Sequence, residues 1–140
     1  MIVLDTNVLS ALMRRDGDPI VTAWLDDQPV ESIWTTAVTV FEIGFGLQIL
    51  PDGRRRRQLE DAVGHLLEDD LEGRVLPFEQ SAAQEAASIA ARRRRIGRPI
   101  EIRDAQIAGI VAARRGTLAT RNTRHFNDLG IALVDPWAVR

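Results

Sequence analysis

The stretch that decides the fold is the amino terminus, Met1-Ile2-Val3-Leu4-Asp5-Thr6-Asn7-Val8-Leu9-Ser10. A short, continuously apolar run at 2–4 predicts a central strand of a parallel sheet, because such strands are buried on both faces. Asp5 then lies at the carboxyl end of that strand, the edge where open α/β sheets bind ligands. Asp5 is therefore a candidate functional residue. The alternative is that Asp5, Thr6 or Asn7 caps the helix that follows.

The rest of the chain alternates short apolar strands with amphipathic helices. We expect strands at 32–35, 74–77, 118–120 and 131–134, and helices at 6–14, 19–27, 38–47, 54–72, 79–96 and 104–115. This alternation predicts one α/β domain over 1–140, a three-layer α/β/α sandwich with a central, mostly parallel sheet of about five strands. Around helix 38–47, the spacing of the apolar residues predicts a stripe that faces the core, formed by Val38, Phe41, Phe45 and Ile49.

Composition limits the chemistry and the location of the chain. There is no cysteine, every basic residue is arginine, and the two histidines, His65 and His125, are far apart in the sequence. Disulfides, thiolate nucleophiles and lysine chemistry are thereby excluded, and an imidazole-based zinc site is poorly supported. The opening apolar run is too short for a signal peptide, and no run approaches the ~20 residues of a membrane span. We expect a cytoplasmic protein without a membrane partner.

Three acids, Asp5, Glu42 and Asp104, are embedded in apolar sequence, where an unpaired charge would be costly. Each has an alternative structural explanation. Thr39-x-x-Glu42 has the spacing of a capping box, and Asp104, which opens the apolar helix 105–115, could be its N-cap or a favourable partner of its macrodipole. However, Asp5 ends a strand, while the other two lie early in helices that lead back across the sheet. All three can therefore reach one crevice at its carboxyl edge.

Carboxylates crowded into one crevice repel one another unless a cation neutralises them. Ligation by oxygen atoms alone favours Mg²⁺, with Mn²⁺ as the alternative ion. Such an ion activates water and stabilises the charge that develops on phosphate oxygens, without any need for histidine. The constellation of acids therefore predicts metal-dependent hydrolysis of phosphodiester bonds.

Several short motifs occur in order along the chain. They are Leu4-Asp5-Thr6-Asn7, Phe41-Glu42-Ile43-Gly44-Phe45-Gly46, Arg103-Asp104-Ala105-Gln106-Ile107-Ala108, Ala119-Thr120-Arg121-Asn122-Thr123-Arg124-His125-Phe126 and Asp135-Pro136-Trp137. Together they resemble the PIN-domain ribonucleases, specifically the VapC/FitB-like toxins of type II toxin–antitoxin pairs. The resemblance covers essentially the whole chain and implies a single PIN-like domain.

The resemblance also implies roles and partners. Asp5 and Asp104 would be the principal Mg²⁺ ligands, and Glu42 would be the third acid of the site. The polar supports around them would be Thr6, Asn7, Thr120 and, with less support, Asn122. The implied partners are an RNA substrate, a cognate antitoxin protein and a second copy of the chain in a homodimer, which could join a higher toxin–antitoxin assembly.

The chain departs from the family pattern at one place. Many PIN domains carry a fourth acid after the third motif, where this chain has Asn122 and His125. Three carboxylates rather than four lower the negative charge of the site, which favours one tightly held ion over two. An amide can still hydrogen-bond to a metal-bound water. We therefore expect Asn122→Asp to tighten metal binding or to admit a second ion.

Two arginine clusters differ in their surroundings. Arg54 to Arg57 are followed at helical spacing by acids, so a solvated, internally paired helix face explains much of that run. A second cluster has no acid three or four residues upstream of its four consecutive members, and we expect it to contact RNA or the antitoxin. This cluster comprises Arg92, Arg93, Arg94, Arg95 and Arg98.

The leading functional prediction is a Mg²⁺-dependent endoribonuclease toxin. The alternative is a catalytically weak PIN-like binding module that acts mainly in an antitoxin and repressor complex. Two other α/β proteins with an aspartate at a strand end fit less well. A haloacid-dehalogenase-type phosphatase would need an acid at Asn7, and a receiver domain normally relies on a lysine, which this chain lacks.

Overall fold

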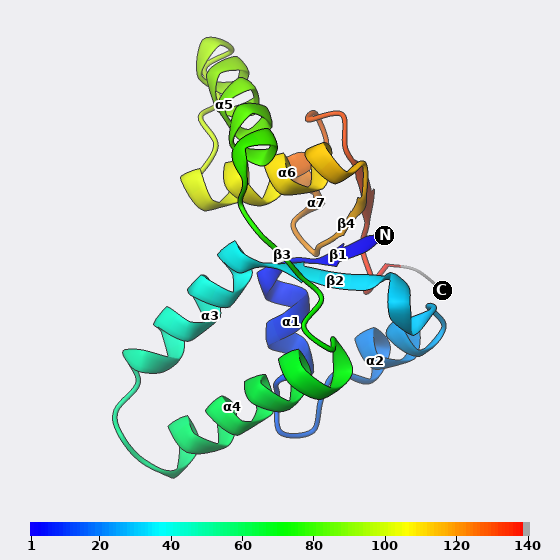
Figure 1. Cartoon of the computed structure of the whole chain (residues 1–140), viewed down its shortest axis with the longest axis vertical. Coiled ribbons are helices and arrows are strands. Elements are labelled where there is room, and N and C mark those ends of the chain that lie inside the picture. Colours follow the sequence, from blue (N-terminus) through cyan, green and yellow to red (C-terminus); the bar gives the residue numbers. More distant parts are fainter. Residues whose placement is uncertain (139–140) are drawn as a thin grey trace.

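A computed structural model describes the fold of residues 1–138 (Figure 1). Five strands alternate with helices along that part of the chain. In order, the elements are β1 (Ile2–Leu4), α1 (Thr6–Leu12), α2 (Pro19–Asp26), η1 (Val30–Ser32), β2 (Ile33–Thr36), α3 (Ala37–Gln48), α4 (Arg54–His65), η2 (Leu66–Asp70), β3 (Val75–Leu76), α5 (Gln80–Arg95), α6 (Ile102–Arg114), β4 (Thr117–Ala119), α7 (Thr123–Phe126) and β5 (Ala132–Val134).

The five strands form one sheet in the order β3-β2-β1-β4-β5, and every neighbouring pair is parallel. The expected α/β fold is therefore confirmed, with an entirely parallel sheet. β1 lies at the centre, where Ile2 pairs with Ile33 of β2 and Leu4 pairs with Ala119 of β4. This register brings Asp5 and Thr120, the residues that follow β1 and β4, to the same edge of the sheet.

Helices cover both faces of the sheet. In Figure 1, α5, α6 and α7 lie on one side of it, and α1, α2 and α4 lie on the other. The alternation of side chains along β1 divides the core accordingly: Val3 packs in the cluster with α5 and α6, and Leu4 packs in the cluster with α1 to α4. Both side chains are fully buried, so β1 has the two-sided burial that its continuous apolar run predicts.

The layer formed by α5 and α6 depends on a close approach between the two helices. A Cβ built at Gly109 of α6 would lie 2.4 Å from the carbonyl oxygen of Ala82 and 2.7 Å from the Cβ of Ala86, both in α5. Only a residue without a side chain fits at this crossing. The resulting contact holds α6, and with it Asp104, firmly against the rest of this layer.

The predicted apolar stripe on α3 is wrong for most of its members. Val38 is buried, but Phe41, Phe45 and Ile49 are 60%, 55% and 67% exposed. The face that packs inward instead carries Thr39, Ile43 and Leu47, which recur every four residues. The threonine belongs on this face because its hydroxyl lies in a hydrogen-bonded group with Thr6 and Thr36.

Several boundaries also differ from the sequence-based expectation. The long helix expected at 54–72 is α4, which ends at His65 and continues as the single π-helical segment η2. The short helix α7 was not predicted, because four residues are too few to show a helical period. Within residues 1–138, no helix is both long and apolar enough to cross a membrane.

Candidate active site

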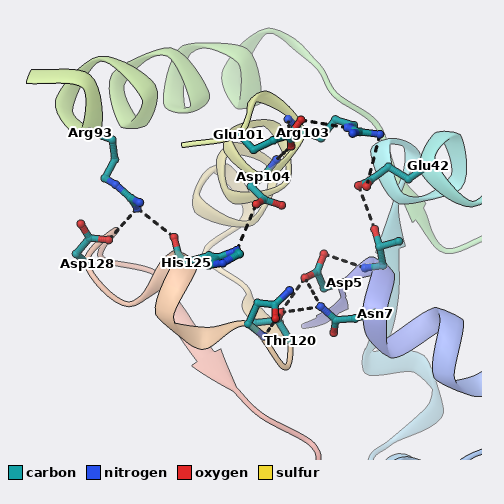
Figure 2. A network of polar contacts seen from close by, with 12 residues as sticks. Asp5, Asn7, Glu42, Arg93, Glu101, Arg103, Asp104, Thr120, His125 and Asp128 are labelled. Carbon is teal, nitrogen blue, oxygen red and sulfur yellow. Dashed lines mark hydrogen bonds and ion pairs between the residues drawn. The ribbon is translucent and has the colours of Figure 1, made fainter. Parts of the chain in front are cut away.

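Asp5 is the most buried acid of the site, with 4% of its surface exposed. Its Oδ1 accepts a hydrogen bond from the backbone N–H of Thr6 at 2.8 Å. Its Oδ2 accepts from the Thr120 hydroxyl at 2.8 Å and from the Asn7 amide at 3.2 Å (Figure 2). Burial nevertheless raises the pKa of Asp5, because the desolvation of the carboxylate outweighs these donors.

Glu42 approaches the site from α3. Its Oε1 accepts a hydrogen bond from the Thr6 hydroxyl at 3.1 Å, and its Oε2 lies 3.9 Å from Nη1 of Arg103. The pKa of Glu42 is raised, mainly by burial and further by the charges of Asp5 and Glu101, against the opposing effects of Thr6 and Arg103. Glu42 therefore shares both a hydrogen-bonding residue and an electrostatic environment with Asp5.

Asp104 is the third residue of α6 and faces the same space (Figure 2). Burial raises its pKa to about 6, together with the negative charges of Asp5, Glu101 and Glu42, while His125 opposes the shift. The Nδ1 atom of His125 lies 3.6 Å from Oδ2 of Asp104. The structure thus brings Asp5, Glu42 and Asp104 into one electrostatically coupled group at the carboxyl edge of the sheet.

Helix capping, the structural alternative for the three acids, applies to some of them and not to others. Asp5 is the N-cap of α1, so its Oδ1 does have a capping role. Glu42 is not part of a capping box: α3 is capped by Thr36, whose hydroxyl accepts from the N–H of Thr39. Asp104 is not an N-cap either, because Glu101 caps α6 and accepts from the backbone N–H groups of residues 103 and 104. Helix capping therefore leaves the Glu42 carboxylate unexplained, whereas Asp104 lies in the first turn of α6, where the helix dipole favours a carboxylate.

The predicted polar supports lie around Asp5. The side-chain amide of Asn7 donates a hydrogen bond to Asp5, and its Oδ1 accepts one from the backbone N–H of Arg121 at 3.1 Å. Asn7 therefore connects the start of α1 to the segment after β4. Thr120 is fully buried, and its hydroxyl also accepts from the backbone N–H of Asn122 at 3.0 Å. Asn122 itself is exposed at the start of α7. It is the predicted support that contributes only a backbone contact.

Two residues near the acids were missing from the predicted site. Arg103 lies between Glu42, at 3.9 Å, and Glu101, at 3.2 Å, so its guanidinium offsets part of the negative charge. His125 faces Asp104 from α7 (Figure 2). The position of Arg103 beside Asp104 in the sequence was a usable signal. For His125, only the tertiary arrangement of α7 against α6 places the ring.

The predicted contact cluster at the end of α5 is corrected at one position. Arg93 is only 6% exposed, and its guanidinium donates to the carbonyl oxygens of Arg98 and His125 and to the Asp128 carboxylate. A buried guanidinium whose donors are occupied by these partners is unavailable to RNA or to another protein. The other members, Arg92, Arg94, Arg95 and Arg98, are exposed.

The donor set fits a hard divalent cation. Asp5, Glu42 and Asp104 offer only oxygen ligands, and no hydrogen-bond donor contacts the carboxylate of Asp104 among the described residues. Their raised pKa values reflect a cost of charging that a bound cation would relieve. Within residues 1–138, no three acidic or histidine side chains already surround one point as a closed ligand shell. An ion bound by these acids would therefore require their side chains to move closer together.

Comparisons with known proteins identify the family. The PIN domain model matches residues 2–131. The chain is 38% identical over 137 residues to VapC ribonuclease Y4jK of Sinorhizobium fredii, covering 98% of each chain. It is 33% identical to Toxin FitB of Neisseria gonorrhoeae, covering 98% of this chain and 99% of FitB. A solved structure of FitAB bound to a DNA fragment matches with a TM-score of 0.89 at 32% identity, covering 100% of this chain and 98% of that one. This chain therefore belongs to the PIN-domain family, within the group that includes the VapC and FitB toxins.

Proposed function

We propose that this chain is the toxin of a type II toxin–antitoxin pair and that it is a Mg²⁺-dependent endoribonuclease acting in the cytoplasm. The observation that carries the proposal is the convergence of three carboxylates, each with a raised pKa, at one edge of the sheet. Names of relatives above 30% identity, VapC ribonuclease and Toxin FitB, support the same activity and role.

Asp5 and Asp104 would hold the ion, with Glu42 as the third acid. Bound there, a divalent ion supplies Lewis-acid activation of water and neutralises charge on the phosphodiester. The protein contributes the orientation of the acids. The hydroxyl of Thr120 and the amide of Asn7 fix Oδ2 of Asp5, and Thr6 fixes Glu42. These hydrogen bonds orient the Asp5 and Glu42 carboxylates, so that less reorganisation remains when the ion binds.

The proposed partners are an RNA substrate and a cognate antitoxin. The solved complexes FitAB and FitAcB support the antitoxin, because the toxin chains in them match this chain at 32% identity over almost its full length. Arg92, Arg94, Arg95 and Arg98 remain the proposed contacts to RNA or antitoxin. We also propose that the chain forms a homodimer, which can join a higher toxin–antitoxin assembly.

A second candidate function is a catalytically weak binding module that acts mainly in a complex with the antitoxin. The observation that favours it is the absence of a fourth acid, because Asn122 and His125 stand where many PIN domains carry one. In that case, the chain would bind its antitoxin normally but would cleave RNA slowly or not at all.

Cleavage of a mixed RNA substrate in the presence of Mg²⁺ tests both functions. We expect cleavage that EDTA abolishes and that falls at least about 100-fold in Asp5→Asn and Asp104→Asn, because each variant loses a proposed ligand. Asp61→Asn, an exposed acid on α4, is the matched control and should cleave normally. Circular dichroism establishes that each variant is folded. Cleavage that persists in both site variants contradicts the assignment, and no cleavage by the wild type favours the binding module.

A further inference from the structure

His125 lies where the chain lacks the fourth acid, and its imidazole faces the site. Its Nδ1 atom is 3.6 Å from Oδ2 of Asp104 (Figure 2). This separation is longer than a hydrogen bond, so the two groups are adjacent without being bonded. The His125 side chain is 59% exposed and that of Asp104 is 27% exposed, so an ion arriving from solvent can reach both.

The backbone beneath His125 is fixed by contacts to other elements. Its carbonyl oxygen accepts a hydrogen bond from Arg93 at 3.0 Å, and its N–H donates to the carbonyl oxygen of Asn122 at 3.0 Å. Arg93 is buried and is itself held by Asp128 at 3.1 Å. The next residue, Phe126, is only 1% exposed in the core. These contacts fix the backbone of α7 that carries the imidazole.

We propose that His125 supplies a nitrogen ligand to the ion held by Asp5 and Asp104, so that the site binds a first-row transition ion such as Mn²⁺ in preference to Mg²⁺. This inference rests on the proposed function, because it requires the metal site, and it changes only which of the two ions, Mn²⁺ or Mg²⁺, that site binds more tightly. Neighbouring ligands of an ion with bonds of about 2.1 Å lie roughly 3 Å apart. The imidazole nitrogen and the Asp104 oxygen must therefore approach by about half an ångström, and Asp5 must also move toward the ion, since no three such side chains within residues 1–138 are placed to hold one as they stand.

The preference follows from the chemistry of the ligand atoms. Mg²⁺ takes oxygen ligands almost exclusively, whereas imidazole nitrogen suits first-row transition ions and is among their commonest protein ligands. An imidazole in place of a fourth carboxylate also lowers the negative charge of the site. The lower charge weakens the binding of Mg²⁺ most, because Mg²⁺ is bound mainly by electrostatic attraction. The rival arrangement is a histidine that only pairs with Asp104. In that arrangement the imidazole competes with any ion, and its removal strengthens the binding of Mg²⁺ and Mn²⁺ alike.

Pulsed electron paramagnetic resonance of the full chain loaded with Mn²⁺ separates these arrangements, because a directly bound imidazole modulates the Mn²⁺ echo through its ¹⁴N nucleus. The chain has only two histidines, which makes the assignment clean. His65→Ala is the matched control, since His65 is an exposed residue of α4 paired with Asp69. We expect the nitrogen modulation in the wild type and in His65→Ala, and its loss in His125→Ala.

Calorimetric titrations with Mn²⁺ and Mg²⁺ give a second readout that does not depend on activity. Loss of the nitrogen ligand in His125→Ala should weaken Mn²⁺ binding about 10-fold or more, with Mg²⁺ affinity changed by less than about 2-fold. His125→Asp should lack the nitrogen modulation and bind Mg²⁺ more tightly than the wild type. Mn²⁺ binding without nitrogen modulation in the wild type, or tighter binding of both ions by His125→Ala, overturns this inference alone. Failure of the wild type to bind either ion overturns the proposed function as well.

Discussion

At the scale of single residues, Asp104 is the acid that most strongly links the site to pH. Its pKa is raised to about 6 by burial and by the negative charges of Asp5, Glu101 and Glu42. A carboxyl group with a raised pKa binds its proton more tightly in the folded protein than in the unfolded chain. The metal-free protein should therefore lose stability as the pH rises from about 4 to about 6, and this loss should persist at higher pH.

Substitution of Asp104 by asparagine removes the free-energy cost of an ionised carboxylate at this position in the folded protein. We expect Asp104→Asn to raise the free energy of unfolding of the metal-free protein by about 1–2 kcal/mol at pH 8, after allowance for partial solvent screening. The gain should disappear below about pH 3, where the aspartate is protonated in both states. Urea unfolding in EDTA across this pH range measures the effect. Asp61→Asn serves as the control on α4, and a destabilised Asp104→Asn at pH 8 would contradict the electrostatic explanation.

Thr120 is the hydroxyl on which the orientation of Asp5 depends. Thr120→Val keeps the shape of the side chain but removes the donor to Oδ2 of Asp5, which is 2.8 Å away. We expect a loss of about 1–3 kcal/mol in the free energy of unfolding and metal binding weakened about 10-fold. Thr35→Val is the matched control, because Thr35 is also fully buried and donates to a backbone carbonyl at 2.9 Å. It should lose stability while keeping its metal affinity, and equal metal affinities in the two variants would argue against the role of Thr120.

At the scale of elements, the crossing of α5 and α6 sets the position of Asp104. Gly109→Ala should destabilise the protein by about 1–3 kcal/mol, because the new methyl group would lie 2.4 Å from the carbonyl oxygen of Ala82 and the helices would have to separate. Gly64→Ala on α4 is the control, since no atom of another element lies within 4 Å of its added Cβ. There, the higher helix propensity of alanine should stabilise the protein by about 0.5–1 kcal/mol. Thermal unfolding of both variants checks the pair, and equal shifts would contradict the close approach.

At the scale of the whole molecule, we propose that the exposed residues Phe41, Phe45 and Ile49 form the contact face of the predicted homodimer. Phe41 and Phe45 stack with their ring centroids 6.2 Å apart, and both remain largely exposed together with Ile49. Adjacent exposed aromatic residues on one helix are typical of the centre of a protein–protein interface.

The double substitution Phe41→Ser and Phe45→Ser tests this face. We expect the dimer to dissociate at least about 100-fold more readily, because buried aromatic anchors contribute most of the energy of an interface. Light scattering coupled to gel filtration, over a range of protein concentrations, measures the change. Ile20→Ser, which alters a single exposed apolar residue on α2, is the control and should leave the dimer intact. A wild-type chain that is monomeric at all concentrations, or a double variant that remains dimeric, contradicts the assignment.

The sequence by itself determined the parallel sheet and the position of Asp5 at its edge. A continuous apolar run such as 2–4 specifies two-sided burial, and the alternation of strands with helices leaves few topologies. It also located Glu42 and Asp104 on helices near that edge. These features are readable because strand burial and helical period are local properties of the chain.

Only the tertiary structure decided which face of α3 is buried, that Arg93 is an internal anchor, and that His125 faces Asp104. Each depends on contacts between segments far apart in the sequence. Thr39 turns inward because Thr6 meets it from α1, and Arg93 is buried because the carbonyl oxygen of His125 and the carboxylate of Asp128 are there to accept its hydrogen bonds. A local sequence pattern cannot indicate a contact that forms only when distant segments come together in the folded protein.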